Sequence, residues 1–323
     1  MILTLITLLL LFIPGILLLI YATGRGAHKL DMVEYVLYGS VLWNYMFISL
    51  SILIGLFSNF FREFYTVFAF LSFLAIIVGI GLNLRIFRRP ISFKESIKIQ
   101  IKIIPKIKLK LLVIVIILLF LTINLLFLNY HSIIYEWDAI YYYVPIAKSL
   151  VISGHLSNVL RDLNFVEHSP AIPIFYSFIL HFDENIENLY LVPSVFFILT
   201  ALAILELAKT MKFRNASFIA VLVFINSPSV QIVLGSRALY LDLPFLFYFT
   251  TSLLLITKMA EDDNKSIEEF LLPLSLTLLF LTRIEVSLFI LPALFVAYLL
   301  PSNIGARADL PLAFFTMFSV PIL

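Results

Sequence analysis

Residues 2–20 read ILTLITLLLLFIPGILLLI, an apolar run without a single charged residue. An α-helix rises 1.5 Å per residue, so about 20 such residues cross the ~30 Å hydrocarbon layer of a membrane. Because lipid offers no hydrogen bonds to the backbone, a segment of this kind has to be helical. The run has neither the basic start nor the small-residue cleavage site of a signal peptide, which favours a retained membrane-spanning helix.

Similar apolar runs recur along the whole chain. We predict further spans at 35–58, 65–86, 111–128, 190–208, 215–235, 243–258, 268–282 and 286–300, with the start of another at 311–323. Of the 323 residues, 62% are hydrophobic and 13% are charged, against roughly 25% charged in a soluble domain. These features predict an all-α, polytopic transmembrane helical bundle surrounded by membrane lipids. A net charge of +2 gives no indication of a nucleic-acid partner, and the absence of cysteine excludes disulfides and thiolate chemistry.

A strongly basic linker fixes the predicted orientation. Residues 85–110 carry nine lysines and arginines against one acid, Glu95, and positive loops are retained in the cytoplasm. Within it, residues 92–103 fit either an amphipathic helix on an anionic leaflet or a solvated loop. We divide the chain into a three-helix N-terminal module (1–86), a cytoplasmic linker (87–110) and a transmembrane core (111–323).

The next predicted span delivers a large loop, residues 129–189, to the outer face of the membrane. Its charges agree with that placement, since it holds seven acids and only two basic residues. Two apolar stretches in the loop, 139–152 and 171–182, have the length of a helix but not of a span. We expect them to lie along the membrane interface as short helices.

Asp138 lies at the start of the first of these short helices. A carboxylate there is suited to cap the helix by accepting its first N–H bonds. Alternatively, a carboxylate at the rim of a membrane cavity is suited to act as a general base toward an acceptor hydroxyl. Four of the five histidines also lie in the loop, but their spacing matches no metal-ligand signature, so no metal site is predicted. These are His131, His155, His168 and His181.

Four motifs in a fixed order carry a family resemblance. The motifs are Glu136-Trp137-Asp138 leading a helix that ends at Ser153-Gly154, then Glu167-His168-Ser169-Pro170, then SRALYLDLPFLFYF with Arg237 and Asp242, and finally Leu281-Thr282-Arg283. Together they resemble the GT-C superfamily of membrane glycosyltransferases, in the branch of protein O-mannosyltransferases and aminoarabinose transferases. The similarity covers most of residues 111–300. Ser169 stands where that family has a proline, and the chain stops inside an apolar run, which implies a short or truncated member.

The resemblance implies an enzyme that moves a sugar from a polyprenyl or dolichyl phosphate to an acceptor hydroxyl, with inversion. Asp138 would be the base, and Arg237 and Arg283 would bind the donor phosphate through their paired N–H donors. The resemblance further places three residues beside the acceptor or its neighbours: Asp242, His168 and Glu136. The acceptor could be a protein, a lipid or a glycan. No cofactor is implied for certain, and because GT-C enzymes divide in metal dependence, a divalent metal stays an open alternative.

Other interpretations of the same residues remain. Both arginines could form ion pairs, with Asp242 and Glu285, that only fix helix packing, and His168 could be a loop histidine bonded to backbone. A transporter or flippase of lipid-linked glycans would use a similar bundle, but such proteins bind near the midplane and often have symmetric halves, and no repeat is visible. A non-catalytic accessory subunit would tolerate loss of Asp138 or Arg237.

Overall fold

The three-dimensional structure is a computed structural model of the 323-residue chain. It describes residues 2–23, 30–57, 61–87, 139–156, 170–212, 217–225, 227, 242–261, 266–283 and 292. Every regular element in these ranges is helical. The helices are α1 (Ile2–Thr23), α2 (Met32–Phe57), α3 (Phe61–Phe87), η2 (Ala139–Tyr143, a π-helical turn), α6 (Val144–Ser153), α8 (Ala171–Phe182), η3 (Ile186–Tyr190), α9 (Leu191–Thr210), α10 (Ser217–Ile225), α12 (Asp242–Glu261) and α13 (Ser266–Thr282).

The prediction of an all-α polytopic bundle is confirmed, and the chain is a multi-pass membrane protein. Five described helices are long and apolar enough to cross a membrane: Ile2–Thr23, Met32–Leu56, Arg62–Asn83, Ile186–Thr210 and Asp242–Ala260. Each overlaps a predicted span. The predicted span 268–282 is the 17-residue helix α13, and the described part of 215–235 contains α10. The predicted spans 111–128, 286–300 (apart from Pro292) and 311–323, and the linker after Phe87, lie outside the described residues.

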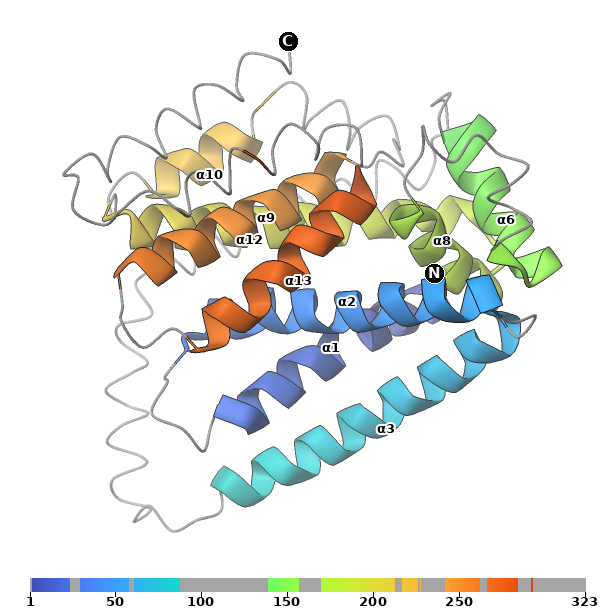
Figure 1. Ribbon diagram of the computed structural model, residues 1–323, viewed down its shortest axis with the longest axis horizontal. Helices are drawn as coiled ribbons and strands as arrows, with labels where there is room; N and C mark the ends of the chain where they lie inside the picture. Colours follow the sequence, from blue (N-terminus) through green and yellow to red (C-terminus); the bar gives the residue numbers. More distant parts are fainter. Residues whose placement is uncertain are drawn as a thin grey trace.

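The long helices run in alternating directions between the two ends of the bundle (Figure 1). We call one the Asp31 end, where Asp31 contacts Lys209 at the C-terminus of α9. The other is the Asp242 end, where Asp242 contacts Arg283. Helices α1, α3, α9 and α12 run toward the Asp31 end, whereas α2 and α13 run away from it. These relative directions are the ones the predicted topology requires; which end faces the cytoplasm stays a prediction.

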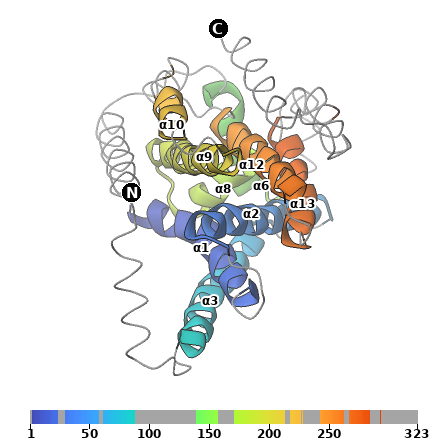
Figure 2. The same cartoon turned by 90° about the vertical axis from the view of Figure 1, so that its left-hand side faces the viewer.

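Viewed end on, α9 and α12 form one side of the bundle, α2 and α13 lie beside them, and α1 and α3 follow (Figure 2). Helix α3 diverges from the others and packs mainly on α1. It leaves apolar side chains exposed along its length, including Val67, Phe70, Phe73 and Val78. In a membrane these side chains face lipid, where exposure of apolar surface is favourable rather than costly.

Two glycines allow α1 and α2 to cross at close range. A Cβ on Gly15 would lie 2.0 Å from the carbonyl oxygen of Gly39, and a Cβ on Gly39 would lie 2.5 Å from backbone atoms of Ile16. Small residues at such crossings are typical of membrane helices, because packing replaces the hydrophobic effect as the force between them. Nearby, the indole Nε1 of Trp43 donates to the Leu10 carbonyl at 3.0 Å and fixes the two helices further.

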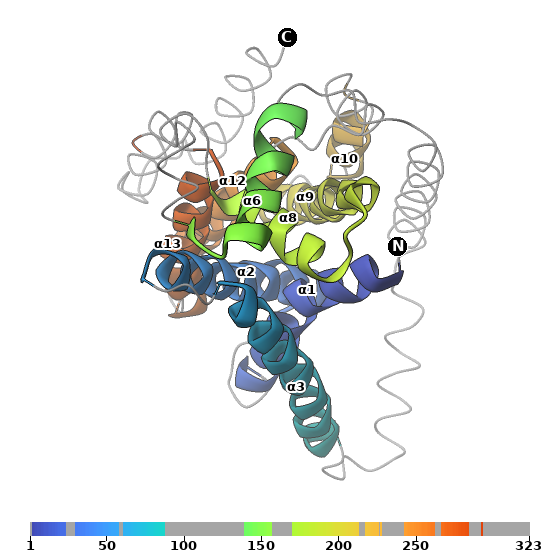
Figure 3. The same cartoon turned by 90° about the vertical axis from the view of Figure 1, so that its right-hand side faces the viewer.

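Helix α8 matches the predicted stretch 171–182 at both ends, and it lies inside the Asp242 end of the bundle (Figure 3). Every residue from Ala171 to Leu180 is buried, so protein rather than lipid or water covers the helix. Phe175 and Phe178 pack against Phe47 of α2 in tilted and edge-to-face geometry, with ring centroids 5.6 and 4.9 Å away. Tyr65 of α3 shares a hydrogen bond with the Ser177 hydroxyl. This helix therefore joins the three N-terminal helices to the rest of the bundle.

Candidate functional site

Asp242 and Arg283, two of the predicted site residues, meet at one end of the bundle. Asp242 is the first residue of α12, where a negative charge is favoured by the helix dipole. Arg283 follows the last residue of α13, where a positive charge is favoured for the same reason. The Arg283 Nη1 donates to Asp242 Oδ1 although 41 positions separate them in the chain. Antiparallel packing of α12 on α13 produces this contact. The sequence left open ion pairs of the two arginines with Asp242 and Glu285, and the structure pairs Arg283 with Asp242.

This ion pair is accessible from outside the protein. The side chains of Arg283 and Asp242 are 35% and 40% exposed. A guanidinium carries five N–H donors in a planar fork that fits carboxylate and phosphate oxygens alike. Because the pair is partly exposed, a phosphate oxygen could replace the carboxylate without leaving a charge buried and unpaired. The arrangement is therefore suited to holding an anion at the Asp242 end.

The other predicted site residues, Glu136, Asp138, His168 and Arg237, lie outside the described residues. The described segments η2–α6 and α8, which follow two of the predicted motifs, both lie at the Asp242 end (Figure 3). Gly154 ends α6 with φ of 68°, a left-handed conformation that favours glycine. Ser153-Gly154, the last two residues of the first motif, therefore mark the end of helix α6.

Helix α8 ends in a group of polar contacts that also lies at this end. His181 Nε2 is 3.0 Å from the Thr66 hydroxyl of α3. Burial lowers the pKa of His181 below its ordinary value, the positive charge of Arg62 lowers it further, and Glu63 acts in the opposite direction. The imidazole is therefore held in its neutral form more firmly than a solvated histidine.

Asp183 joins the turn after α8 to the first turn of α1. Its carboxylate accepts hydrogen bonds from the Thr4 hydroxyl, from Asn188 Nδ2 at 2.9 Å and from the Asn185 N–H at 3.2 Å. Burial acts to raise the pKa of Asp183, but these donors outweigh it and hold the pKa below its ordinary value. Asp183 is a structural anchor with all of these bonds inside the protein.

Of the four histidines considered for a metal site, only His155 and His181 are described. Among the described residues no group of three or more His, Asp or Glu side chains is placed to hold a metal ion. His131 and His168 lie outside the described residues.

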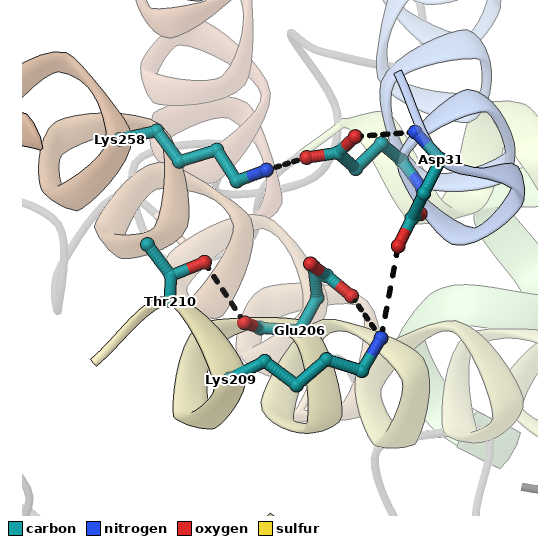
Figure 4. Close-up of polar contacts among 6 residues, drawn as sticks. Asp31, Glu206, Lys209, Thr210 and Lys258 are labelled. Atoms are coloured by element: carbon teal, nitrogen blue, oxygen red, sulfur yellow. Dashed lines mark hydrogen bonds and ion pairs between the residues drawn. The ribbon is translucent and has the colours of Figure 1, made fainter. Parts of the chain in front are cut away.

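A second charged cluster, at the Asp31 end, was missed by the sequence analysis (Figure 4). Asp31 and Glu34 form a capping box at the start of α2: the Asp31 N–H donates to Glu34 Oε2 at 2.6 Å, and the Glu34 N–H donates to Asp31 Oδ1 at 2.9 Å. Lys258 of α12 pairs with Glu34. Lys209 of α9 lies 2.5 Å from Glu206 and 3.7 Å from Asp31. The cluster ties three helix ends together.

A signal for part of this cluster was present in the sequence. Asp31-Met32-Val33-Glu34 is a D-x-x-E pattern directly before an apolar run, which is typical of a helix start. Lys209 and Lys258 lie at the ends of the predicted spans 190–208 and 243–258, where a basic residue is also typical of a topology signal. Nothing in the local sequence identifies their carboxylate partners, because those lie on another helix.

Polar side chains also meet in the interior of the bundle. Asn44, near the middle of α2, donates from Nδ2 to the Tyr248 hydroxyl of α12 at 3.1 Å, and both are fully buried. The Ser252 hydroxyl on α12 lies 2.9 Å from the Ser275 hydroxyl on α13. Polar groups within membrane spans are costly unless paired, and they often mark functional pathways. An asparagine inside an apolar run was the available signal for this contact.

No family model, no curated protein and no solved structure matches this chain. Its function therefore has to be argued from the two charged ends and the polar interior. They differ in what is buried. At the Asp31 end Asp31 and Lys209 are 48% and 33% exposed, but each lysine of the cluster also pairs with a glutamate, Glu34 or Glu206, whose side chain is only 6% or 8% exposed. Asp242 and Arg283 are both partly open. The Asp242 end is the better candidate for binding a charged substrate.

Proposed function

We propose that the chain is a membrane glycosyltransferase that moves a sugar from a polyprenyl-phosphate donor to an acceptor hydroxyl at the Asp242 end. One observation supports this most directly: Arg283 and Asp242, separated in sequence, form a partly exposed ion pair at the end that also holds α6 and α8. Arginine's fork fits phosphate oxygens, and an exposed carboxylate partner can be exchanged for them.

The reaction assigns a role to each predicted residue. The acceptor oxygen attacks the anomeric carbon, its proton passes to Asp138, and the bond from that carbon to the phosphate oxygen breaks. The polyprenyl phosphate leaves with the bonding electrons and needs no proton. Arg283 and Arg237 stabilise the charge that develops on it. Asp242 positions Arg283 before the donor binds.

Roles beside the acceptor go to His168 and Glu136, as the family resemblance implies. The acceptor is a protein, lipid or glycan hydroxyl.

The test uses purified full-length protein, radiolabelled polyprenyl-phosphate sugars and a set of candidate acceptors. Asp138→Asn should reduce turnover about 10²–10⁴-fold, the usual contribution of a general base. Arg283→Ala should reduce it about 10²–10³-fold, as expected for loss of charge stabilisation. Arg62→Ala is a matched control, because Arg62 is an exposed arginine at the start of α3, near the same end. Equal transfer by wild type and Asp138→Asn would remove Asp138 from the mechanism.

A charge exchange separates catalysis from packing. Combining Asp242→Arg with Arg283→Asp restores an ion pair but places a carboxylate at the α13 position where the phosphate would bind. If the pair serves only helix packing, the exchange should recover both folding and transfer. The proposed function predicts recovered melting temperature and no transfer. Absence of transfer by the folded wild type from every lipid donor would reject the proposal.

A transporter or flippase of lipid-linked glycans is the second candidate, and the buried contact of Asn44 with Tyr248 favours it. Such polar groups inside spans are typical of substrate and ion pathways. Proteoliposomes containing a fluorescent lipid-linked glycan distinguish the two. Translocation without sugar transfer would support the transporter and replace the first proposal.

A further inference from the structure

Six buried side-chain atoms lack a hydrogen-bond partner within the described part of the chain, and three of the six lie on α2 and α12 in the interior of the bundle. These three are the Tyr38 hydroxyl and the Asn44 Oδ1 on α2, and the Thr251 hydroxyl on α12. All three residues are 0% exposed. A buried polar group without a partner is costly, and lipid cannot supply one. Three of them within two facing helices therefore indicate that a polar molecule occupies the space between them.

Two contacts fix how α2 and α12 face each other. Glu34 pairs with Lys258, and Asn44 with Tyr248. The two contacts are equally far apart on the two antiparallel helices. Glu34 and Asn44 are ten residues apart on α2, and Tyr248 and Lys258 are ten residues apart on α12, about 15 Å in each case. Thr251 lies on the same face of α12, three residues from Tyr248. It therefore falls between the levels of Asn44 and Tyr38.

The Thr251 hydroxyl also departs from the rule followed by its neighbours. A hydroxyl inside a helix commonly donates to the carbonyl four residues earlier. Eleven described hydroxyls do so: Thr7, Thr23, Ser40, Ser51, Ser194, Thr200, Thr210, Ser252, Thr257, Thr277 and Thr282. The Thr251 hydroxyl makes no bond of this kind to described protein atoms. Its conformation is explained if a partner outside the protein accepts or donates there.

The Tyr38 hydroxyl connects these atoms to the charged cluster at the Asp31 end. Tyr38 follows Glu34 of the cluster by four residues on α2, which is about one helical turn and the same face of the helix. Asp31 and Lys209 are themselves 48% and 33% exposed, so the cluster reaches the surface. Polar groups are thus found at successive levels from the surface at the Asp31 end to Asn44.

We propose that a short file of internal water molecules lies between α2 and α12 and links Tyr38, Thr251 and Asn44 to the Asp31 end. Six residues separate Tyr38 from Asn44, about 9 Å along the helix. At ordinary hydrogen-bond spacing this length takes about two or three waters, and internal waters commonly make about three hydrogen bonds each. Water is chosen because the three atoms include donors and acceptors but no charge.

The consequence is that solvent enters from the Asp31 end as far as the middle of α2. Asn44 is the thirteenth residue of this 26-residue helix, so the file would reach close to the membrane midplane. This inference does not depend on the sugar-transfer reaction, which is assigned to the opposite end. It gives the bundle a hydrated half-path that an ordinary structural subunit would not need.

Radiolytic hydroxyl-radical footprinting of the full chain in lipid nanodiscs tests the inference, because bound water generates the radical in place. Tyr38 is the reporter, and Tyr65 is the matched control: it is also 0% exposed on a long helix, but its hydroxyl is bonded to Ser177. We expect Tyr38 to be oxidised clearly faster than Tyr65. Equal rates for the two tyrosines in the wild-type protein would overturn the proposal.

A variant tests whether the waters form one connected file. Thr251→Val removes the hydroxyl with little change of shape, and it should slow the oxidation of Tyr38 while leaving Tyr65 unchanged. Thr257→Val is the control, since the Thr257 hydroxyl bonds to the Leu253 carbonyl of its own helix. An unchanged Tyr38 rate in folded Thr251→Val would overturn the connected file. If that variant does not fold, the wild-type comparison still decides whether water is present at Tyr38.

Discussion

The crossing of α1 over α2 provides the sharpest stability prediction, with Gly39→Ala as the perturbation. The new Cβ would lie 2.5 Å from the Ile16 N and Cα, which is 0.9 Å short of an ordinary 3.4 Å contact. Backbone atoms cannot rotate away, so the helices must separate. Overpacking of this kind costs about 1–3 kcal/mol, and separation also strains the Trp43 to Leu10 hydrogen bond, worth about 1 kcal/mol. Alanine's better helix propensity returns up to about 1 kcal/mol, so the net loss is about 1–3 kcal/mol.

Gly81→Ala is the matched control for this prediction. Gly81 lies in α3, and a Cβ there meets no atom within 4 Å, so only the gain in helix propensity remains. The two variants are unfolded in mixed micelles by titration with a denaturing detergent, which measures the difference in their free energies of unfolding. The close-crossing argument fails if Gly39→Ala is as stable as Gly81→Ala.

Three further predictions concern other contacts. Lys258→Met should lower the free energy of unfolding by about 3–5 kcal/mol, because it leaves the buried Glu34 carboxylate without its cation. Glu34→Gln should lower it less, because Lys258 can extend to water. Equal losses for the two variants in detergent unfolding would contradict this. Since burial lowers the pKa of His181, its contribution to stability is full above the unfolded pKa of about 6.5 and declines as pH falls below that value. The melting temperature should therefore fall between pH 7.5 and 5.5, and His181→Gln should reduce this fall. An identical fall in the variant would show that His181 is not its cause. Ser177→Ala should lower the free energy of unfolding by about 1–3 kcal/mol, because the buried Tyr65 hydroxyl loses its bond to Ser177. Adding Tyr65→Phe should lower it little more, a non-additivity that a double-mutant cycle measures.

The helices were largely predictable, because each is a local pattern. Helix α8 was predicted at its observed bounds, since it lies between Pro170 and Asp183 and is apolar throughout. Its surroundings were not predictable in the same way. A stretch too short to span suggests a helix on the membrane surface, but the structure covers α8 with α1, α2, α3, α6 and α13. An apolar helix has the same sequence whether lipid or protein surrounds it.

Contacts between residues that are distant in the sequence were also less predictable than the helices. The sequence suggested that Arg237 and Arg283 could pair with Asp242 and Glu285, but not that Asp242 meets Arg283, as the structure shows. The cluster around Glu34 was not foreseen, because its partners lie on α9 and α12. Local patterns identify a helix start such as the capping box, but only packing decides which lysine meets it.

Burial separates the glutamate ion pairs at the Asp31 end from the pair of Asp242 with Arg283. At the Asp31 end, Glu34 is nearly inaccessible and its carboxylate also accepts the Asp31 N–H, so exchanging its lysine partner would leave a buried charge uncompensated. Such a pair holds helices together and resists replacement by a ligand. At the Asp242 end the ion pair is partly solvated, so a phosphate can compete with the carboxylate at little cost in buried charge. Under the proposed function, a charged lipid head group therefore binds at the second kind of pair, while the ion pairs at the Asp31 end connect α2 to α9 and α12.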